Sequence, residues 1–151
     1  MEFSHVDEHG KARMVDVSHK PRVRRTAYAE GFVQMAPETA AAIQQNALAK
    51  GDVLGCARIA GIQAAKRTAE LIPLCHNIEI EHVQVDATVE TNGVRIRSSC
   101  VCTDKTGIEM EALCAVSVAA LTIYDMCKAM DKNMVIKNVH LVSKTKEEIH
   151  D

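Results

Sequence analysis

A stretch near the carboxyl end of the chain, residues 110–124, carries almost no polar side chains beyond Glu111, Ser117 and Thr122. Together with its flanks, the stretch predicts one long helix from Glu109 to Lys132. A helix that is apolar on nearly every side is buried. The chain must therefore place other elements around this helix.

Periodicity and stop signals predict the remaining elements. Pro37 suits a first helical turn, Gly51 a helix stop and Asp52 a helix cap. Asn92-Gly93 predicts a hairpin, and a change of phase near Glu81-His82 predicts a β-bulge. Residues 1–22 are polar and predicted to be irregular. The predicted elements are strands at 25–34, 78–89, 94–102 and 134–142 and helices at 37–50, 52–72 and 109–132.

The order strand, helix, helix, strand, strand, helix, strand indicates an α+β protein. It is typical of a ferredoxin-like split βαβ sandwich, with an antiparallel sheet packed by helices. Small residues throughout 52–72 predict that this helix packs closely against another element. No linker divides the chain, so residues 1–151 are expected to form a single domain.

Composition excludes several classes of protein. The net charge of −2 argues against a general nucleic-acid binder. No stretch is expected to be long and apolar enough to span a membrane, and the polar residues 1–10 do not resemble a signal peptide. Six cysteines are then expected to be reduced thiols of a cytoplasmic protein. Without a Cys-x-x-Cys pair among the six cysteines, no metal site is predicted. Aromatic residues are only 3%, which favours an aliphatic core and oligomerisation.

Asp125 and Lys128, spaced i and i+3, share one face near the end of the long helix. Burial and the helix dipole are expected to raise the pKa of Asp125, whereas Lys128 lowers it. Such opposed influences can poise a carboxylate for proton transfer. An ordinary surface ion pair at a fraying helix end is an equally good interpretation.

Glu109 and Glu111 open the same helix, where acidic side chains are also expected simply because they favour the helix dipole. About 20 Å of helix separates them from Asp125. If both ends serve one reaction, another subunit must complete the pocket.

Cys75-His76 follows the predicted helix stop at Pro73. Neighbouring residues in a turn seldom face each other, so His76 as a hydrogen-bond donor to a ligand is favoured over a nucleophilic cysteine. Cations cluster around Arg25, Lys50 and Lys144 and could hold phosphates, although single surface lysines are usually only solvating. No Gly-rich Walker loop is present.

Long runs of residues resemble cyclic pyranopterin monophosphate synthase, the molybdenum cofactor biosynthesis protein C family, in that family's order over roughly 4–144. The runs are Met14-Val15-Asp16-Val17-Ser18, Lys50-Gly51-Asp52, the stretch from Ala57 to Lys66, Leu71-Ile72-Pro73-Leu74-Cys75-His76, the stretch from Lys105 to Leu113, and the stretch from Ala119 to Lys128.

The resemblance implies an enzyme that converts (8S)-3′,8-cyclo-7,8-dihydroguanosine 5′-triphosphate into cyclic pyranopterin monophosphate and releases diphosphate. It implies ferredoxin-like subunits in hexamers, as trimers of dimers, with active sites at subunit interfaces. No cofactor is implied with certainty, and Mg²⁺ accompanying the triphosphate stays open. The implied catalytic residues are Asp125 and Lys128, and the implied substrate-binding residues are Leu74, Cys75, His76, Glu109, Met110, Glu111, Lys50, Arg25 and Lys144.

Two features depart from the family pattern. Asn77 stands where many members have proline, and the usual Gly-Gly-Lys-Ser-Gly stretch is replaced by Lys144-Thr145-Lys146-Glu147-Glu148. A flexible lid at this position is therefore not expected. Two rival hypotheses remain: a non-catalytic oligomeric module that binds a purine nucleotide or pterin, and a cysteine-dependent metal or redox protein.

Overall fold

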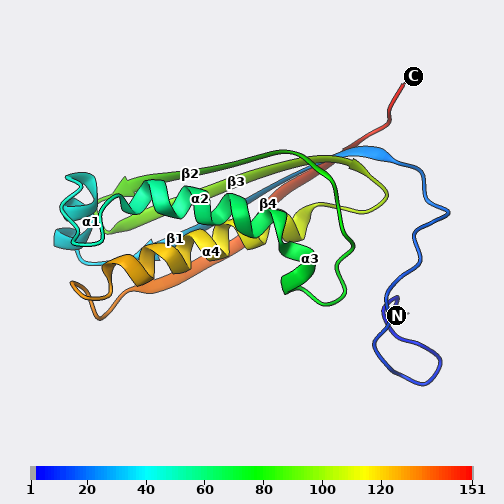
Figure 1. Cartoon of the computed structure of the whole chain (residues 1–151), viewed down its shortest axis with the longest axis horizontal. Coiled ribbons are helices and arrows are strands. Elements are labelled where there is room, and N and C mark those ends of the chain that lie inside the picture. The colour runs from blue at the N-terminus through cyan, green and yellow to red at the C-terminus, as the bar shows by residue number, and fades with distance from the viewer. Residues whose placement is uncertain (1–2, 151) are drawn as a thin grey trace.

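The computed structural model describes residues 3–150 as a four-stranded antiparallel sheet with helices packed on one face (Figure 1). Along the sheet the strands lie in the order β2-β3-β1-β4, which confirms the ferredoxin-like α+β prediction. The elements are β1 (Val23–Gln34), α1 (Pro37–Gln44), α2 (Val53–Lys66), α3 (Thr68–Leu71), β2 (Ile80–Glu90), β3 (Gly93–Asp104), α4 (Glu109–Cys127) and β4 (Val135–Glu147).

Helix α4 is the core helix, as its sequence predicts. It packs against β1, β3 and β4 on one side and against α2 on another (Figure 1). The two helices approach so closely that a Cβ added at Gly61 would lie 2.8 Å from the carbonyl oxygen of Ala115. The small residues of α2 therefore do allow the predicted close packing.

One expectation about α4 is wrong. By length and composition α4 is apolar enough to cross a membrane, contrary to the prediction that no stretch would be. The apolar character of α4 is explained by its place in this fold, because more than half of its most apolar stretch is buried between the sheet and α2.

Several element boundaries differ from the sequence prediction. Helix α1 ends at Gln44 rather than near Lys50, because Asn46 adopts a positive φ of 54°. The predicted helix at 52–72 divides into α2 and the single turn α3, and α4 ends at Cys127 rather than at Lys132. The Asp52 cap on Gly55 and the bulge between Ile80 and His82 are confirmed.

The other differences concern the strands. The hairpin between β2 and β3 turns on Thr91-Asn92, since Glu90 pairs with Gly93, so the turn lies one residue before the predicted position. Strand β4 continues to Glu147, five residues beyond the predicted end, because it stays paired with β1.

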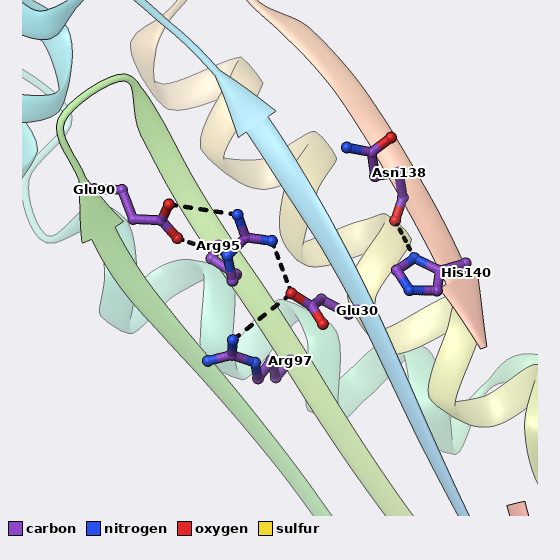
Figure 2. Close-up of polar contacts among 6 residues, drawn as sticks. All are labelled: Glu30, Glu90, Arg95, Arg97, Asn138 and His140. Atoms are coloured by element: carbon purple, nitrogen blue, oxygen red, sulfur yellow. Dashed lines mark hydrogen bonds and ion pairs between the residues drawn. The ribbon is translucent and has the colours of Figure 1, made fainter. Parts of the chain in front are cut away.

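The face of the sheet opposite the helices carries a group of ion pairs. Figure 2 shows Arg95 between the carboxylates of Glu90 and Glu30. Arg95 is 2.6 Å from Glu90 and 2.7 Å from Glu30, and Arg97 is 3.7 Å from Glu30. A hydrated outer face of this kind is ordinary for an antiparallel sheet with one buried face. The candidate site residues lie elsewhere, at the two ends of α4.

Candidate functional site

A cavity of about 320 Å³ lies beside the first turn of α4. It brings together six of the predicted substrate-binding residues from two distant parts of the chain. They are Leu74, Cys75 and His76, after α3, and Glu109, Met110 and Glu111, in α4. The amino-terminal arm, residues 3–22, supplies another wall through Val15, Val17 and Lys20.

Glu111 is the most perturbed acid of this cavity. Its residue is only 4% exposed, and its Oε2 atom has no hydrogen-bond partner among residues 3–150. Burial raises the pKa of Glu111 to about 7, and the negative charges of Glu109 and Asp104 act in the same direction. Glu111 can therefore exchange a proton near neutral pH, and its unpaired oxygen can accept a hydrogen bond from a ligand.

Glu109 behaves in the opposite way although it lies only two residues earlier. Burial acts to raise its pKa, but a hydrogen bond from its own backbone and the Lys144 ammonium outweigh burial, so the pKa of Glu109 lies below its ordinary value. The Nζ of Lys144 is 3.0 Å from Oε1 of Glu109. One helix turn thus holds a permanent anion beside a carboxyl that titrates near neutrality.

The neighbouring Cys75 and His76 have different constraints. Burial first, then the charge of Glu111, raises the pKa of the Cys75 thiol, so it is not a thiolate at neutral pH and is a poor nucleophile. Nε2 of His76 donates to the carbonyl oxygen of Val15 over 2.7 Å. Because this bond uses the Nε2 proton, His76 can donate from Nδ1 to a ligand only as the imidazolium.

A second, smaller cavity of about 210 Å³ adjoins the first, and Gly107 and Glu109 line both. Its cations are Arg25, Lys144 and Lys146. The Arg25 guanidinium donates to the carbonyl oxygens of Asp104 and Lys105 at 3.3 and 3.2 Å and so fixes the loop that leads into α4. The structure thus brings the predicted Arg25 and Lys144 together, and it adds Lys146.

Asp125 and Lys128 lie at the opposite end of α4, together with Lys50. The Asp125 carboxylate is 3.0 Å from the Nζ of Lys50 and 3.0 Å from that of Lys128. The side chains of Asp125 and Lys128 are 56% and 57% exposed, so the expected burial of this pair is wrong for the single chain. Lys50 contacts Asp125 and does not line the cavity of Arg25 and Lys144, the cations with which the sequence analysis grouped it.

The pKa of Asp125 lies below its ordinary value because Lys50 and then Lys128 donate hydrogen bonds to the carboxylate. The expected rise of this pKa is therefore also wrong, since it depended on burial. Asp125 is a stable anion in the chain alone, and the protons at this end of α4 are carried by the two ammonium groups.

Sequence reasoning missed two contributions to the site. Lys146 entered the sequence analysis only as part of the stretch that replaces the Gly-Gly-Lys-Ser-Gly pattern. Its place beside Arg25 depends on the extended pairing of β4. The arm was expected to be irregular, and its role as a cavity wall depends on the His76 bond to Val15 and on the bond from Lys105 to the carbonyl oxygen of Ser18. The run Met14–Ser18 had signalled the arm only through the family resemblance.

Among residues 3–150, no group of three or more His, Cys, Asp or Glu side chains could hold a metal ion. All six cysteines are free thiols, four of them buried. The polar groups at the two ends of α4 that can act on a ligand are carboxyl, imidazole and ammonium groups.

Comparisons with known proteins show which family the chain resembles over most of its length. A family model described as the MoaC family matches residues 14–147. A cyclic pyranopterin monophosphate synthase of Desulfatibacillum aliphaticivorans is 56% identical over 145 residues, which cover 95% of this chain and 91% of that protein. A protein of the same name from Chloroflexus aurantiacus is 54% identical over 95% of this chain and 89% of its own length. The chain also matches 46% of a molybdenum cofactor biosynthesis bifunctional protein of Chlorobaculum tepidum, at 52% identity.

Proposed function

The chain belongs to the MoaC family, and from this we propose that it is a cyclic pyranopterin monophosphate synthase of molybdenum cofactor biosynthesis. Its substrate in this proposal is (8S)-3′,8-cyclo-7,8-dihydroguanosine 5′-triphosphate, and its products are cyclic pyranopterin monophosphate and diphosphate. The structural observation that carries the proposal is the cavity around Glu111. It combines an unpaired buried carboxyl with an adjoining group of cations.

Glu111 holds the guanine-derived ring in this proposal. The amino and ring N–H groups of such a base are hydrogen-bond donors. The Oε2 atom of Glu111 is a hydrogen-bond acceptor that has no donor within residues 3–150. Because its pKa is about 7, Glu111 can also take up or return a ring proton at neutral pH. Leu74, Met110 and Cys75 then pack around the ring as apolar walls of the same cavity.

Asp125 and Lys128 remain the proposed catalytic pair, with their roles revised by the geometry. Asp125 is held as an anion by two ammonium groups, so it acts as proton acceptor or orienting group, and Lys128 or Lys50 acts as proton donor. Exclusion of water on binding would strengthen these interactions, since charges attract more strongly in a medium of low dielectric constant. His76 and Glu109 position the sugar portion near Glu111.

The two ends of α4 are too far apart to meet within one chain. Fourteen residues separate Glu111 from Asp125, and at a rise of 1.5 Å per residue they span about 21 Å. We therefore propose a homo-oligomer, a hexamer of three dimers, in which Asp125 of one copy meets Glu111 of another. Leu121, one turn before Asp125, is 58% exposed, and such exposed apolar side chains favour an interface.

Compartment and metal requirement belong to the same proposal. Free thiols, four of them buried, favour the reducing cytoplasm. Mg²⁺ would accompany the triphosphate, an arrangement that needs only one or two protein carboxylates. Glu109 is the carboxylate that borders the cation-lined cavity.

The proposed reaction is tested by incubating the purified protein with the cyclised nucleotide and following diphosphate release and pterin formation. Turnover by the wild-type protein is expected, and Glu111→Gln should abolish it. Tight binding of the nucleotide without release of diphosphate would instead identify a non-catalytic binding module.

A further inference from the structure

Lys146 lies beside the two cations that the family resemblance assigned to the substrate. Its direct partner across the strands is Arg25, and Lys144 is paired with Ala27. Residues two apart in a strand point to the same face, so Lys144 and Lys146 both point to the face on which the buried Ala27 contacts the core. All three cations line the same cavity, at the end of the sheet beside α4.

This cavity carries more positive than negative charge. Three cations and a single carboxylate, Glu109, line a volume of about 210 Å³. Lys144 is held by Glu109 at 3.0 Å, and Arg25 donates to two backbone carbonyl oxygens. Among residues 3–150, no acidic side chain forms an ion pair with Lys146. The cavity can therefore accept an anion without first breaking a contact of Lys146.

The backbone that presents Lys146 is ordered. Pairing between β1 and β4 continues through Thr26 and Thr145 to Arg24 and Glu147. The stretch that stands in place of the Gly-Gly-Lys-Ser-Gly pattern is thus the end of a paired strand. A lysine on such a strand loses less conformational freedom on binding than one on a flexible loop.

We propose that Lys146 is a further binding residue for the diphosphate end of the substrate, and that it completes a subsite with Arg25 and Lys144, the two cations that the resemblance already implies. The proposal rests on the proposed function, which identifies the anion as the terminal phosphates of the substrate and the departing diphosphate. Arg25 supplies a planar pair of donors, and each lysine supplies a point charge. When the anion binds, Lys144 shares its charge between the phosphate and Glu109.

The subsite is tested first with inorganic diphosphate, titrated calorimetrically into the full-length protein at two salt concentrations. Lys146→Gln is expected to weaken binding roughly fivefold, because a charged hydrogen bond to an exposed anion contributes modestly. It should also reduce the salt dependence of affinity. Lys146→Arg should keep most of the affinity. The matched control is Lys137→Gln, which removes the same charge from the other end of β4, near Phe32.

Equal affinities of Lys146→Gln and the wild-type protein for diphosphate would overturn the subsite, as would an equal loss in Lys137→Gln. Steady-state kinetics separate this proposal from the proposed function. If the protein releases diphosphate from the cyclised nucleotide but Lys146→Gln leaves KM unchanged, only the subsite fails. A roughly fivefold rise of KM with little change of kcat supports a binding role. If the wild-type protein does not convert the cyclised nucleotide, the proposed function fails. The diphosphate titration then still tests the subsite.

Discussion

Glu111→Gln removes a carboxyl that the fold holds in an unfavourable environment. Burial raises the pKa of Glu111 from 4.5 to about 7. The native protein therefore binds the Glu111 proton more tightly than the unfolded chain does. Below pH 4.5 Glu111 is protonated in both the native and the unfolded state, so it does not lower the stability of the native state. As the pH rises from 4.5 to 7 the unfolded state loses the proton first, so native stability falls, and above pH 7 the full cost is present.

The size of this effect follows from the pKa shift. At 1.36 kcal/mol for each pKa unit, the wild-type protein should lose on the order of 2 to 3 kcal/mol between pH 5 and pH 8 relative to Glu111→Gln. The assay is urea unfolding of both proteins at the two pH values and equal protein concentration. The quantity to compare is the change in unfolding free energy between pH 5 and pH 8, not its absolute value, because a buried glutamine amide lowers the stability at both pH values.

Glu109→Gln is the matched control, two residues away in the same helix. The pKa of Glu109 lies below its ordinary value, so its charged form stabilises the native state above the unfolded pKa, and this stabilisation is lost as the pH falls. Glu109→Gln should therefore be less stable than wild type at pH 8, with the difference shrinking towards pH 4. If Glu111→Gln followed the wild-type pH dependence in parallel, Glu111 would not be the group that titrates near 7.

Three further substitutions test other parts of the structure. Asp125→Asn should lower the rate of diphosphate release at least about a hundredfold. Circular dichroism should show an unchanged fold, since the side chain of Asp125 is exposed. Near-normal turnover would exclude Asp125 from catalysis. Cys75→Ser should keep activity within about twofold, because the raised thiol pKa makes it a poor nucleophile, and inactivation with an intact fold would restore a covalent mechanism. Gly61→Ala should destabilise the protein by about 1 to 3 kcal/mol in thermal unfolding, because the new methyl meets the Ala115 carbonyl at 2.8 Å; an unchanged Tm would mean that α2 and α4 can move apart freely.

The sequence predicted the fold well because its signals were local and agreed with one another. The Asp52 cap, the bulge before His82 and the apolar length of α4 each require only neighbouring residues to be recognised. The boundary errors come from contacts that periodicity does not contain. The positive φ of Asn46 stops α1, and pairing with β1 extends β4 to Glu147.

The burial of the site residues was predicted less well than the fold, because it depends on which face of α4 the rest of the chain covers. Leu121, Asp125 and Lys128 recur at i, i+4 and i+7 and so share one stripe of α4, and all three are exposed. The average apolar character of the helix suggested burial for Asp125, but the rest of the described chain, residues 3–150, leaves this stripe exposed, and Lys50 contacts Asp125 at 3.0 Å without burying it. Glu111 lies on the covered side, and its ordinary explanation as a helix-start charge gave no sign of its burial.

The shared site can be measured by mixing two inactive variants, Glu111→Gln and Asp125→Asn, after dissociation and reassembly. If one copy provides Glu111 and its neighbour provides Asp125, half of randomly formed pairs are mixed, and each mixed pair has one intact site and one doubly altered site. Activity should then return to about one quarter of the wild-type value. No recovery from assembled mixed oligomers would show that each site draws both residues from a single chain, and the two-ended arrangement along α4 would be wrong.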